Sequence, residues 1–197
     1  MKEIIFVLLN EFADWEGAFI ATCLNSGVKP GNPIKYKVKT MSLTKEPITS
    51  IGGFKVLPDY SINDLPDDYA GLILIGGMKW FEPEALQIVP LLEKAIVGKK
   101  LVAGICNASV FLGMNGFLDN IKHTSNGLNY IKQFAGTKYR GQNNYINKQA
   151  VRDGNMVTAN GVGHVEFCRE ILYALNADSP EVIEEVYSFY KNDLWPE

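Results

Sequence analysis

The fold is decided by the stretch Leu101-Val-Ala-Gly-Ile-Cys-Asn-Ala-Ser109. Its first part, Leu101–Ile105, is short, apolar and uncharged, which predicts a strand covered on both faces, as parallel central strands are. A helix is expected over Asn107–Asn115, and Gly104 lies two residues before Cys106. A buried strand that turns abruptly into a helix is typical of a nucleophile elbow, here with cysteine in place of serine.

The rest of the chain repeats this alternation of buried strands and helices. Continuous apolar runs predict two more buried strands, Ile4–Leu9 and Leu72–Ile75. Shorter strands are expected at Tyr36–Ser42, Ile48–Val56 (a hairpin), His123–Ser125, Val151–Arg152 and Met156–Ala159. Helices are expected at Asp14–Ser26, Glu84–Val97, Leu128–Phe134, Val165–Leu175 and Glu181–Tyr190. This rhythm predicts an α/β three-layer sandwich: a mostly parallel, doubly wound sheet with helices on both faces.

Composition excludes several classes of protein. The 197 residues are 47% hydrophobic and carry 19 basic and 22 acidic side chains, so we expect one folded domain, residues 1–197, and no disorder. A net charge of −3 argues against binding nucleic acid through bulk charge. No apolar run is long enough for a membrane helix and no signal peptide is evident, so we expect a cytoplasmic protein. The sequence shows neither a Walker A motif nor GxGxxG, and we expect no organic cofactor.

Cys106 is the main candidate for a reactive group. Its place at the expected start of a helix favours a thiolate, and the free N–H groups there point at incoming oxygen atoms. The alternative is a buried structural cysteine, the common role of a free thiol. Cys23 and Cys168 fall in the middle of expected helices and are interpreted as packing residues. Three widely spaced cysteines and two histidines offer no disulfide framework and no metal site.

Other candidates lie where the expected strands end, since parallel sheets place their sites at the carboxyl ends of strands. Glu16, beside Trp15, either faces Cys106 and shares a proton with its sulfur, or is an acid that merely favours a helix start. Gly76 and Gly77 either expose N–H groups to an oxyanion or simply make a tight turn. The residues alone leave these alternatives open.

Six segments together resemble the ThiJ/PfpI family, within the class I glutamine amidotransferase-like superfamily. They are Ala13-Asp-Trp-Glu16, Ser50-Ile-Gly-Gly53, Leu74-Ile-Gly-Gly77, Gly104-Ile-Cys-Asn-Ala-Ser109, Gly116-Phe-Leu-Asp119 and Thr158-Ala-Asn-Gly161. The resemblance covers nearly the whole chain and implies a flavodoxin-like sheet. It also implies that Cys106 is the reactive centre, that Glu16 is protonated and donates a hydrogen bond to the thiolate, and that the Gly77 and Asn107 N–H groups form an oxyanion pocket.

The chain departs from the family at one position. Many members carry a histidine near the cysteine, and aligning Gly116–Asp119 and Thr124-Ser125 puts Asn126 there instead. The family's usual Cys-His dyad is therefore not expected. His164 follows Gly161-Val-Gly163 at the end of a strand and is either a substitute that moves protons or a helix-start or surface histidine. His123 is expected to be structural.

Two functions remain open. The first is a small cysteine-centred enzyme in which Cys106 attacks an electrophilic carbonyl or amide of a small-molecule substrate, as in glyoxalase, deglycase or hydrolase chemistry. Glu16, Gly77, Asn107 and tentatively His164 assist, and Asn126, Gly76 and Trp15 line the pocket. The second is a non-enzymatic redox-sensing or stress-response protein with an oxidisable Cys106. The resemblance also implies a homodimer.

Overall fold

The computed structural model describes residues 1–192 and is built on a seven-stranded sheet. The strands lie in the order β5-β2-β1-β6-β7-β9-β8, and all neighbours are parallel except β8 and β9. The strands are β1 (Lys2–Val7), β2 (Tyr36–Ser42), β5 (Tyr60–Ser61), β6 (Tyr69–Leu74), β7 (Leu101–Ile105), β8 (Ala150–Asp153) and β9 (Met156–Ala159). A separate antiparallel hairpin joins β3 (Ile48–Thr49) and β4 (Lys55–Val56). The expected parallel α/β sheet is confirmed.

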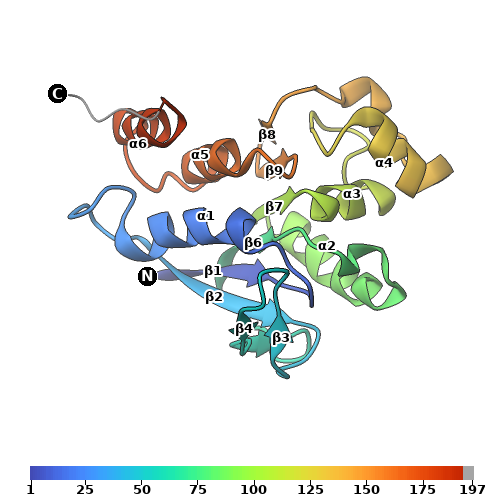
Figure 1. The fold of residues 1–197 in the computed structure, drawn as a ribbon, viewed down its shortest axis with the longest axis horizontal. Helices are drawn as coiled ribbons and strands as arrows, with labels where there is room; N and C mark the ends of the chain where they lie inside the picture. The colour runs from blue at the N-terminus through green and yellow to red at the C-terminus, as the bar shows by residue number, and fades with distance from the viewer. Residues whose placement is uncertain (193–197) are drawn as a thin grey trace.

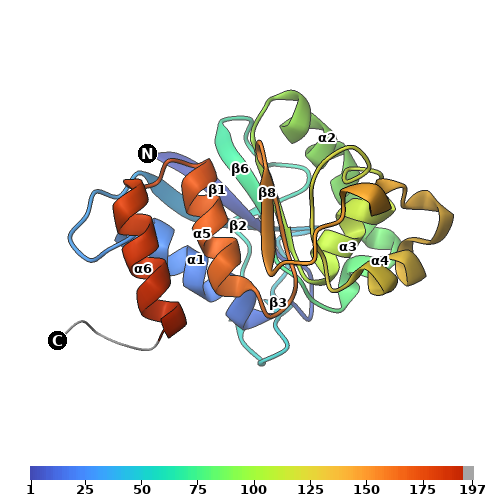
Figure 2. The same cartoon turned by 90° about the horizontal axis from the view of Figure 1, so that it is seen from above.

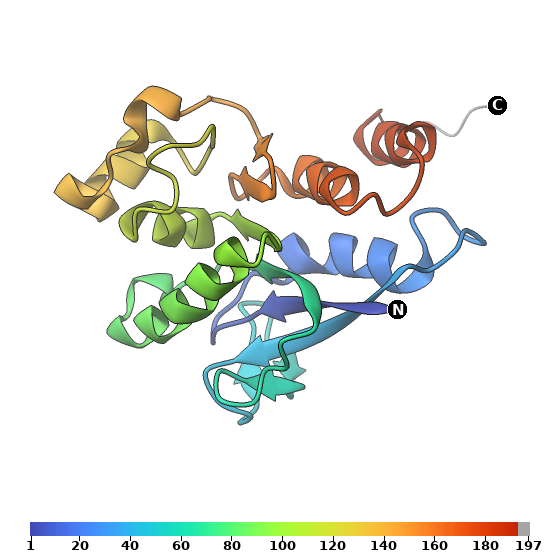
Figure 3. The same ribbon diagram turned by 180° about the vertical axis from the view of Figure 1, so that it is seen from behind.

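Helices cover both faces of this sheet (Figures 1 and 2). They are α1 (Asp14–Ser26), α2 (Val89–Val97), α3 (Asn107–Met114), α4 (Leu128–Ala135), α5 (His164–Ala174) and α6 (Pro180–Asn192). Helices α1 and α5 cover one face with α6 outside them, whereas α2 and α3 cover the other, with α4 against α3 (Figure 3). None of the helices within residues 1–192 is long and apolar enough to cross a membrane.

The alternation of side chains along β1 explains the two-sided core. Ile4 and Phe6 belong to the apolar cluster shared with α1 and α5, while Ile5 and Val7 belong to the cluster shared with α2 and α3. Successive side chains of a strand point to opposite faces, so a strand covered on both sides must be apolar at every position. Burying both faces of the central strands stabilises the sheet and fixes where each strand ends.

Two local expectations were wrong, and one short strand was not expected. The segment expected as one helix from Glu84 begins as a 3-10 helix, Pro83–Ile88, because Pro90 has no N–H to donate to a continuous α-helix. The strand expected at His123–Ser125 is a single bridge between His123 and Tyr145. The sequence also gave no signal for the short strand β5, Tyr60–Ser61.

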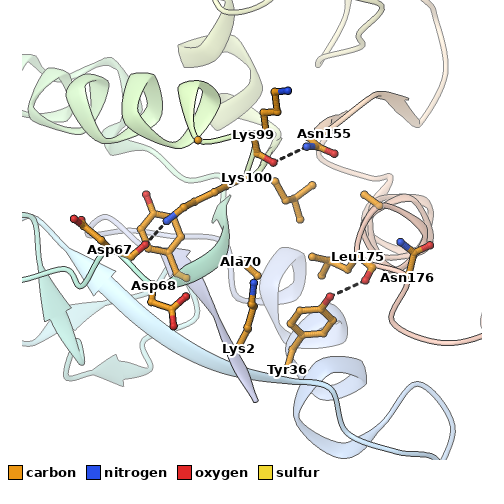
Figure 4. Close-up of a pocket in the computed structure, with 14 residues that line it drawn as sticks. Lys2, Tyr36, Asp67, Asp68, Ala70, Lys99, Lys100, Asn155, Leu175 and Asn176 are labelled. Atoms are coloured by element: carbon orange, nitrogen blue, oxygen red, sulfur yellow. Dashed lines mark hydrogen bonds between the residues drawn. The ribbon is translucent and has the colours of Figure 1, made fainter.

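The topology brings the carboxyl ends of β1, β6, β7 and β9 to one edge of the sheet. The first turn of α1 carries Glu16, and the segments that follow β6, β7 and β9 carry Gly76, Cys106 and Gly161. A cavity of about 430 Å³ lies at the opposite edge, lined by Lys2, Ala70 and the ends of α2 and α5 (Figure 4). Its lining residues bond to one another, as where the Tyr36 hydroxyl donates to the Leu175 carbonyl at 2.7 Å.

Candidate functional site

Cys106 stands at the junction between β7 and α3 in a strained backbone conformation. Its φ and ψ are 56° and −128°, a region that residues with a side chain rarely adopt. The conformation is held by the sheet, because the Cys106 N–H donates to the Ala159 carbonyl at 3.0 Å, and by α3, where Ser109 Oγ donates to the Cys106 carbonyl at 2.6 Å. Such strain at a strand-to-helix turn is the geometry of a nucleophile elbow.

Glu16 lies in the first turn of α1 and is 1% exposed. Its Oε2 accepts a hydrogen bond from the Gly76 N–H at 2.9 Å, while its Oε1 is buried without a hydrogen-bond partner among residues 1–192. A methyl group on Gly161 would lie 3.0 Å from Cys106 Sγ and 3.4 Å from Glu16 Oε1. The sulfur and this oxygen therefore border the same small space.

Burial governs the protonation of this pair. Desolvation raises the pKa of Glu16 to about 7, although the neighbouring Cys106 thiol and the Gly76 N–H favour its charged form. Desolvation, together with the nearby Glu16 charge, raises the pKa of Cys106 to about 11. The helix start was expected to favour a thiolate, but burial and Glu16 outweigh it in this structure. At neutral pH the thiol keeps its proton, and Glu16 is poised to take it.

Asn126 occupies the space beside the sulfur. Its Nδ2 donates to Cys106 Sγ at 3.3 Å and to Asn107 Oδ1 at 3.3 Å, while its Oδ1 accepts the Gly161 N–H at 2.9 Å. The Gly161 N–H fixes the amide so that its NH₂ group faces the sulfur. An amide at this position stabilises negative charge on sulfur but cannot accept the thiol proton.

Asn107 links the elbow to two other segments. Its Nδ2 donates to the Gly77 carbonyl at 2.9 Å, and its Oδ1 accepts a hydrogen bond from the Tyr130 hydroxyl at 3.1 Å. Its backbone N–H interacts with the Cys106 sulfur and favours the thiolate. The Gly77 N–H is the second candidate oxyanion donor, whereas the Gly76 N–H is already bonded to Glu16.

Trp15 closes one side of the site. It is 50% exposed, and its Nε1–H donates to the Gly161 carbonyl at 3.4 Å. This contact joins the start of α1 to the loop between β9 and α5. The structure therefore brings Cys106, Glu16, Asn126, Asn107 and Trp15 together.

The two histidines differ in their surroundings. His123 is fully buried, and its ring nitrogens bond to the Ile121 carbonyl at 2.8 Å and the Tyr139 hydroxyl at 2.6 Å. His164 is the first residue of α5 and is half-buried, with a buried Nδ1 that has no hydrogen-bond partner among residues 1–192. No hydrogen bond joins His164 to Cys106 or Glu16 in that part of the chain.

Sequence reasoning did not single out Tyr130 or Gly161 as site residues. Tyr130 comes from α4, far from the elbow in sequence, and no local motif marks it. Gly161 had a weak signal, because a glycine directly after a strand end often permits close approach of another group.

Comparisons with known proteins give consistent matches over most of the chain. The model of the DJ-1/PfpI family matches residues 2–174. The uncharacterized protease YdeA of Bacillus subtilis is 37% identical over 196 residues, covering 96% of this chain and 94% of that protein. Among solved structures, a thiJ/pfpI family protein from Bacillus anthracis is 34% identical with a TM-score of 0.90, covering 98% of this chain and 92% of that one. A DJ-1 superfamily protein from Agrobacterium tumefaciens is 35% identical with a TM-score of 0.86, covering 98% and 100% of the two chains.

Limiting iodoacetamide at neutral pH is expected to label Cys106 before the other two thiols. Cys23 and Cys168 are 6% and 1% exposed, whereas Cys106 is partly exposed. Gly161→Ala should slow labelling of Cys106 by about 10-fold, because the added methyl group would lie against the sulfur. Peptide mass spectrometry measures both effects, with the thermal midpoint as a folding control. Equal labelling of all three cysteines in folded protein would contradict the prediction.

Glu16→Gln is expected to change how the labelling rate of Cys106 depends on pH. In the wild type the rate should rise through pH 7, where the carboxyl group becomes able to accept the thiol proton. The glutamine keeps a hydrogen-bonding side chain but cannot take that proton, so the rise near pH 7 should disappear. Asp14→Asn, which removes a charge from the same helix end, is the matched control. An unchanged pH profile in Glu16→Gln would show that Glu16 does not accept the thiol proton and merely favours the start of α1.

Proposed function

The chain belongs to the DJ-1/PfpI family, and we propose that it is a small enzyme in which the Cys106 thiol attacks an electrophilic carbonyl carbon. The main observation behind the proposal is that the buried Glu16 carboxyl group, whose pKa is about 7, lies beside the Cys106 sulfur at the elbow. Carboxyl groups tuned toward neutral pH are characteristic of general acid–base catalysts.

The proposed step moves one proton. As a bond forms between Sγ and the carbonyl carbon, the thiol proton passes to Glu16 and the carbonyl electron pair moves to oxygen. The N–H groups of Gly77 and Asn107 stabilise the resulting oxyanion. Glu16 then returns the proton to that oxygen, which completes a neutral thiohemiacetal when the substrate is an aldehyde.

Glyoxalase- or deglycase-like chemistry on a reactive aldehyde fits this arrangement best. Addition to an aldehyde needs one group that takes a proton and gives it back, and Glu16 suffices for this. Asn126 contributes by holding the sulfur and offsetting its developing charge.

Amide hydrolysis is the second candidate reaction. It is favoured by the relatives YdeA and YoaZ of Bacillus subtilis, 37% and 31% identical to this chain, which are both described as uncharacterized proteases. Hydrolysis adds two demands, protonation of the leaving amine and activation of a water molecule. Glu16 would have to meet both unless His164 meets one of them, because Asn126 cannot exchange protons.

The test is turnover of methylglyoxal alongside a fluorogenic peptide. We expect the wild type to consume methylglyoxal, and Cys106→Ser and Glu16→Gln each to lower kcat/KM by about 10²-fold or more, the usual scale for losing a nucleophile or a general base. Mass spectrometry after mild peroxide is measured in parallel. Oxidation of Cys106 to sulfenic or sulfinic acid without turnover of either substrate would refute the proposed enzymatic activity and favour the redox-sensing alternative.

His164 is expected to contribute more to turnover than His123. An imidazole can carry a proton between the groups of a site, and His164, whose buried Nδ1 has no hydrogen-bond partner among residues 1–192, lies three residues after Gly161 in the chain. His164→Ala should lower kcat by about 10²-fold, whereas His123→Ala should mainly lower the free energy of unfolding by removing buried hydrogen bonds. Steady-state kinetics and thermal unfolding measure the two effects. Wild-type activity in His164→Ala would exclude histidine from the reaction.

A further inference from the structure

Tyr130 of α4 reaches the start of α3 with its hydroxyl group. The hydroxyl donates a hydrogen bond to Asn107 Oδ1 at 3.1 Å. The ring of Tyr130 packs on Phe134 with 4.6 Å between the ring centroids, and Phe134 in turn stacks on Phe81 at 4.4 Å. These aromatic contacts hold the Tyr130 ring in place without any help from its hydroxyl group.

The hydroxyl group helps to decide which way the Asn107 amide faces. Asn107 Oδ1 accepts from the Tyr130 hydroxyl and, at 3.3 Å, from Asn126 Nδ2, while Asn107 Nδ2 donates to the Gly77 carbonyl at 2.9 Å. A reversed amide would set two NH₂ groups against each other and two carbonyl oxygens against each other. Burial raises the pKa of Tyr130, so the hydroxyl keeps the proton that it donates at neutral pH.

The amide of Asn107 in turn restrains the backbone of Gly77. The Met78 N–H, on the other side of the Gly77 carbonyl, donates to the Glu11 carbonyl at 3.2 Å. A Cβ atom on Gly77 would lie 2.5 Å from that same Glu11 oxygen, so the segment is closely packed there. The bond from Asn107 Nδ2 therefore joins the two residues whose N–H groups are the proposed oxyanion donors, and it restricts the distance between those N–H groups.

We propose that Tyr130 is a positioning residue, whose hydroxyl group holds the Asn107 amide against Gly77 and so keeps the two oxyanion donors at a fixed separation. The proposal rests on the proposed function, because the oxyanion forms in that reaction. Tyr130 itself gives up no proton in the step. Oxyanion donors act by being held in place before charge develops, so a looser pair of donors stabilises the transition state less.

The first experiment compares two reagents that modify Cys106 by different routes. With p-nitrophenyl acetate, Sγ adds to the ester carbonyl and its proton passes to Glu16; the oxyanion then collapses to a thioester as p-nitrophenolate leaves and takes the proton from Glu16. With iodoacetamide, Sγ displaces iodide from a methylene carbon and no oxyanion forms. Tyr130→Phe, which keeps the aromatic ring, should slow acylation by about 10-fold, less than the loss of an oxyanion donor itself, and change alkylation by less than about 2-fold.

Tyr173→Phe is the matched control. Tyr173 is also half-buried, and its hydroxyl donates to Glu184 Oε1 at 2.8 Å between α5 and α6, so its loss should leave both rates unchanged. A second comparison adds Tyr130→Phe to Asn107→Ala, or to Asn107→Ser if the alanine variant does not fold. In that background Tyr130→Phe should slow acylation no further, because its effect passes through the missing amide. Losses that multiply would overturn the proposal, since Tyr130 would then act on the reactants directly.

A further measurement needs no reaction at the sulfur. Hydrogen exchange of the Asn107 NH₂ group, followed by heteronuclear NMR and assigned by its absence in Asn107→Ala or Asn107→Ser, should become about 5-fold faster in Tyr130→Phe and stay constant in Tyr173→Phe.

The two readouts separate this proposal from the proposed function. If the wild type is not acylated at Cys106 but the exchange responds, the proposed function fails and the positioning of Asn107 by Tyr130 is supported. If acylation occurs and Tyr130→Phe changes only one readout, or neither, the proposal is overturned and the proposed function stands. Equal slowing of acylation and alkylation would also overturn it, because the change would then lie at the sulfur.

Discussion

The contact between the Glu16 carboxyl group, the Gly76 N–H and the Cys106 thiol is the constraint to which the surrounding structure conforms. A Cβ atom on Gly76 would lie 2.3 Å from Glu16 Oε2 and 2.6 Å from the Cys106 Cβ, so β6 can end at this place only with a glycine. Gly161 meets a similar limit from the end of β9, where a Cβ would lie 3.0 Å from the sulfur. Three strand ends and the start of α1 thus converge on a small space around the Glu16 carboxyl group and the Cys106 sulfur, in which neither Gly76 nor Gly161 can carry a side chain.

Asn126 changes the electrostatics of this space relative to the histidine found in many family members. A histidine could carry a positive charge or accept the thiol proton, whereas the amide supplies one fixed N–H donor toward sulfur. Of the side chains at positions 16 and 126, only the Glu16 carboxyl group can therefore accept the thiol proton. Tyr130 and Asn107 extend the amide's hydrogen bonds into α4 and the loop after β6, so Asn126 is held between partners on several elements.

Strong local patterns made much of the fold predictable. The bounds of α1, β2 and β7 agree with the expected segments because each combines a clear period or apolar run with a definite stop, such as Gly27 after α1. The two residues of β5 are too few to carry a period, and the bridge at His123 depends on Tyr145, a partner distant in sequence.

The sequence predicts the site residues that a motif marks. It does not predict the contacts and pKa values that arise only when the surrounding elements pack together. Cys106 and Glu16 follow from the elbow and the family resemblance. Tyr130 reaches Asn107 only because α4 packs on α3, which no local pattern encodes. The high pKa of the thiol follows from desolvation, which arises only once the surrounding elements are in place.

The burial of Glu16 also sets how the stability of the whole fold responds to acidity. A carboxyl group whose pKa rises from 4.5 to about 7 on folding contributes stability that is fully present below pH 4.5 and is lost as the pH rises through about 7. This difference between the pKa of Glu16 in the folded and unfolded states corresponds to roughly 3 kcal/mol, which is a large share of the free energy of unfolding of a domain of this size. The carboxylate that serves the chemistry is thus also a destabilising charge at neutral pH, and the fold is expected to tolerate mild acid better than a protein whose buried acids are ion-paired.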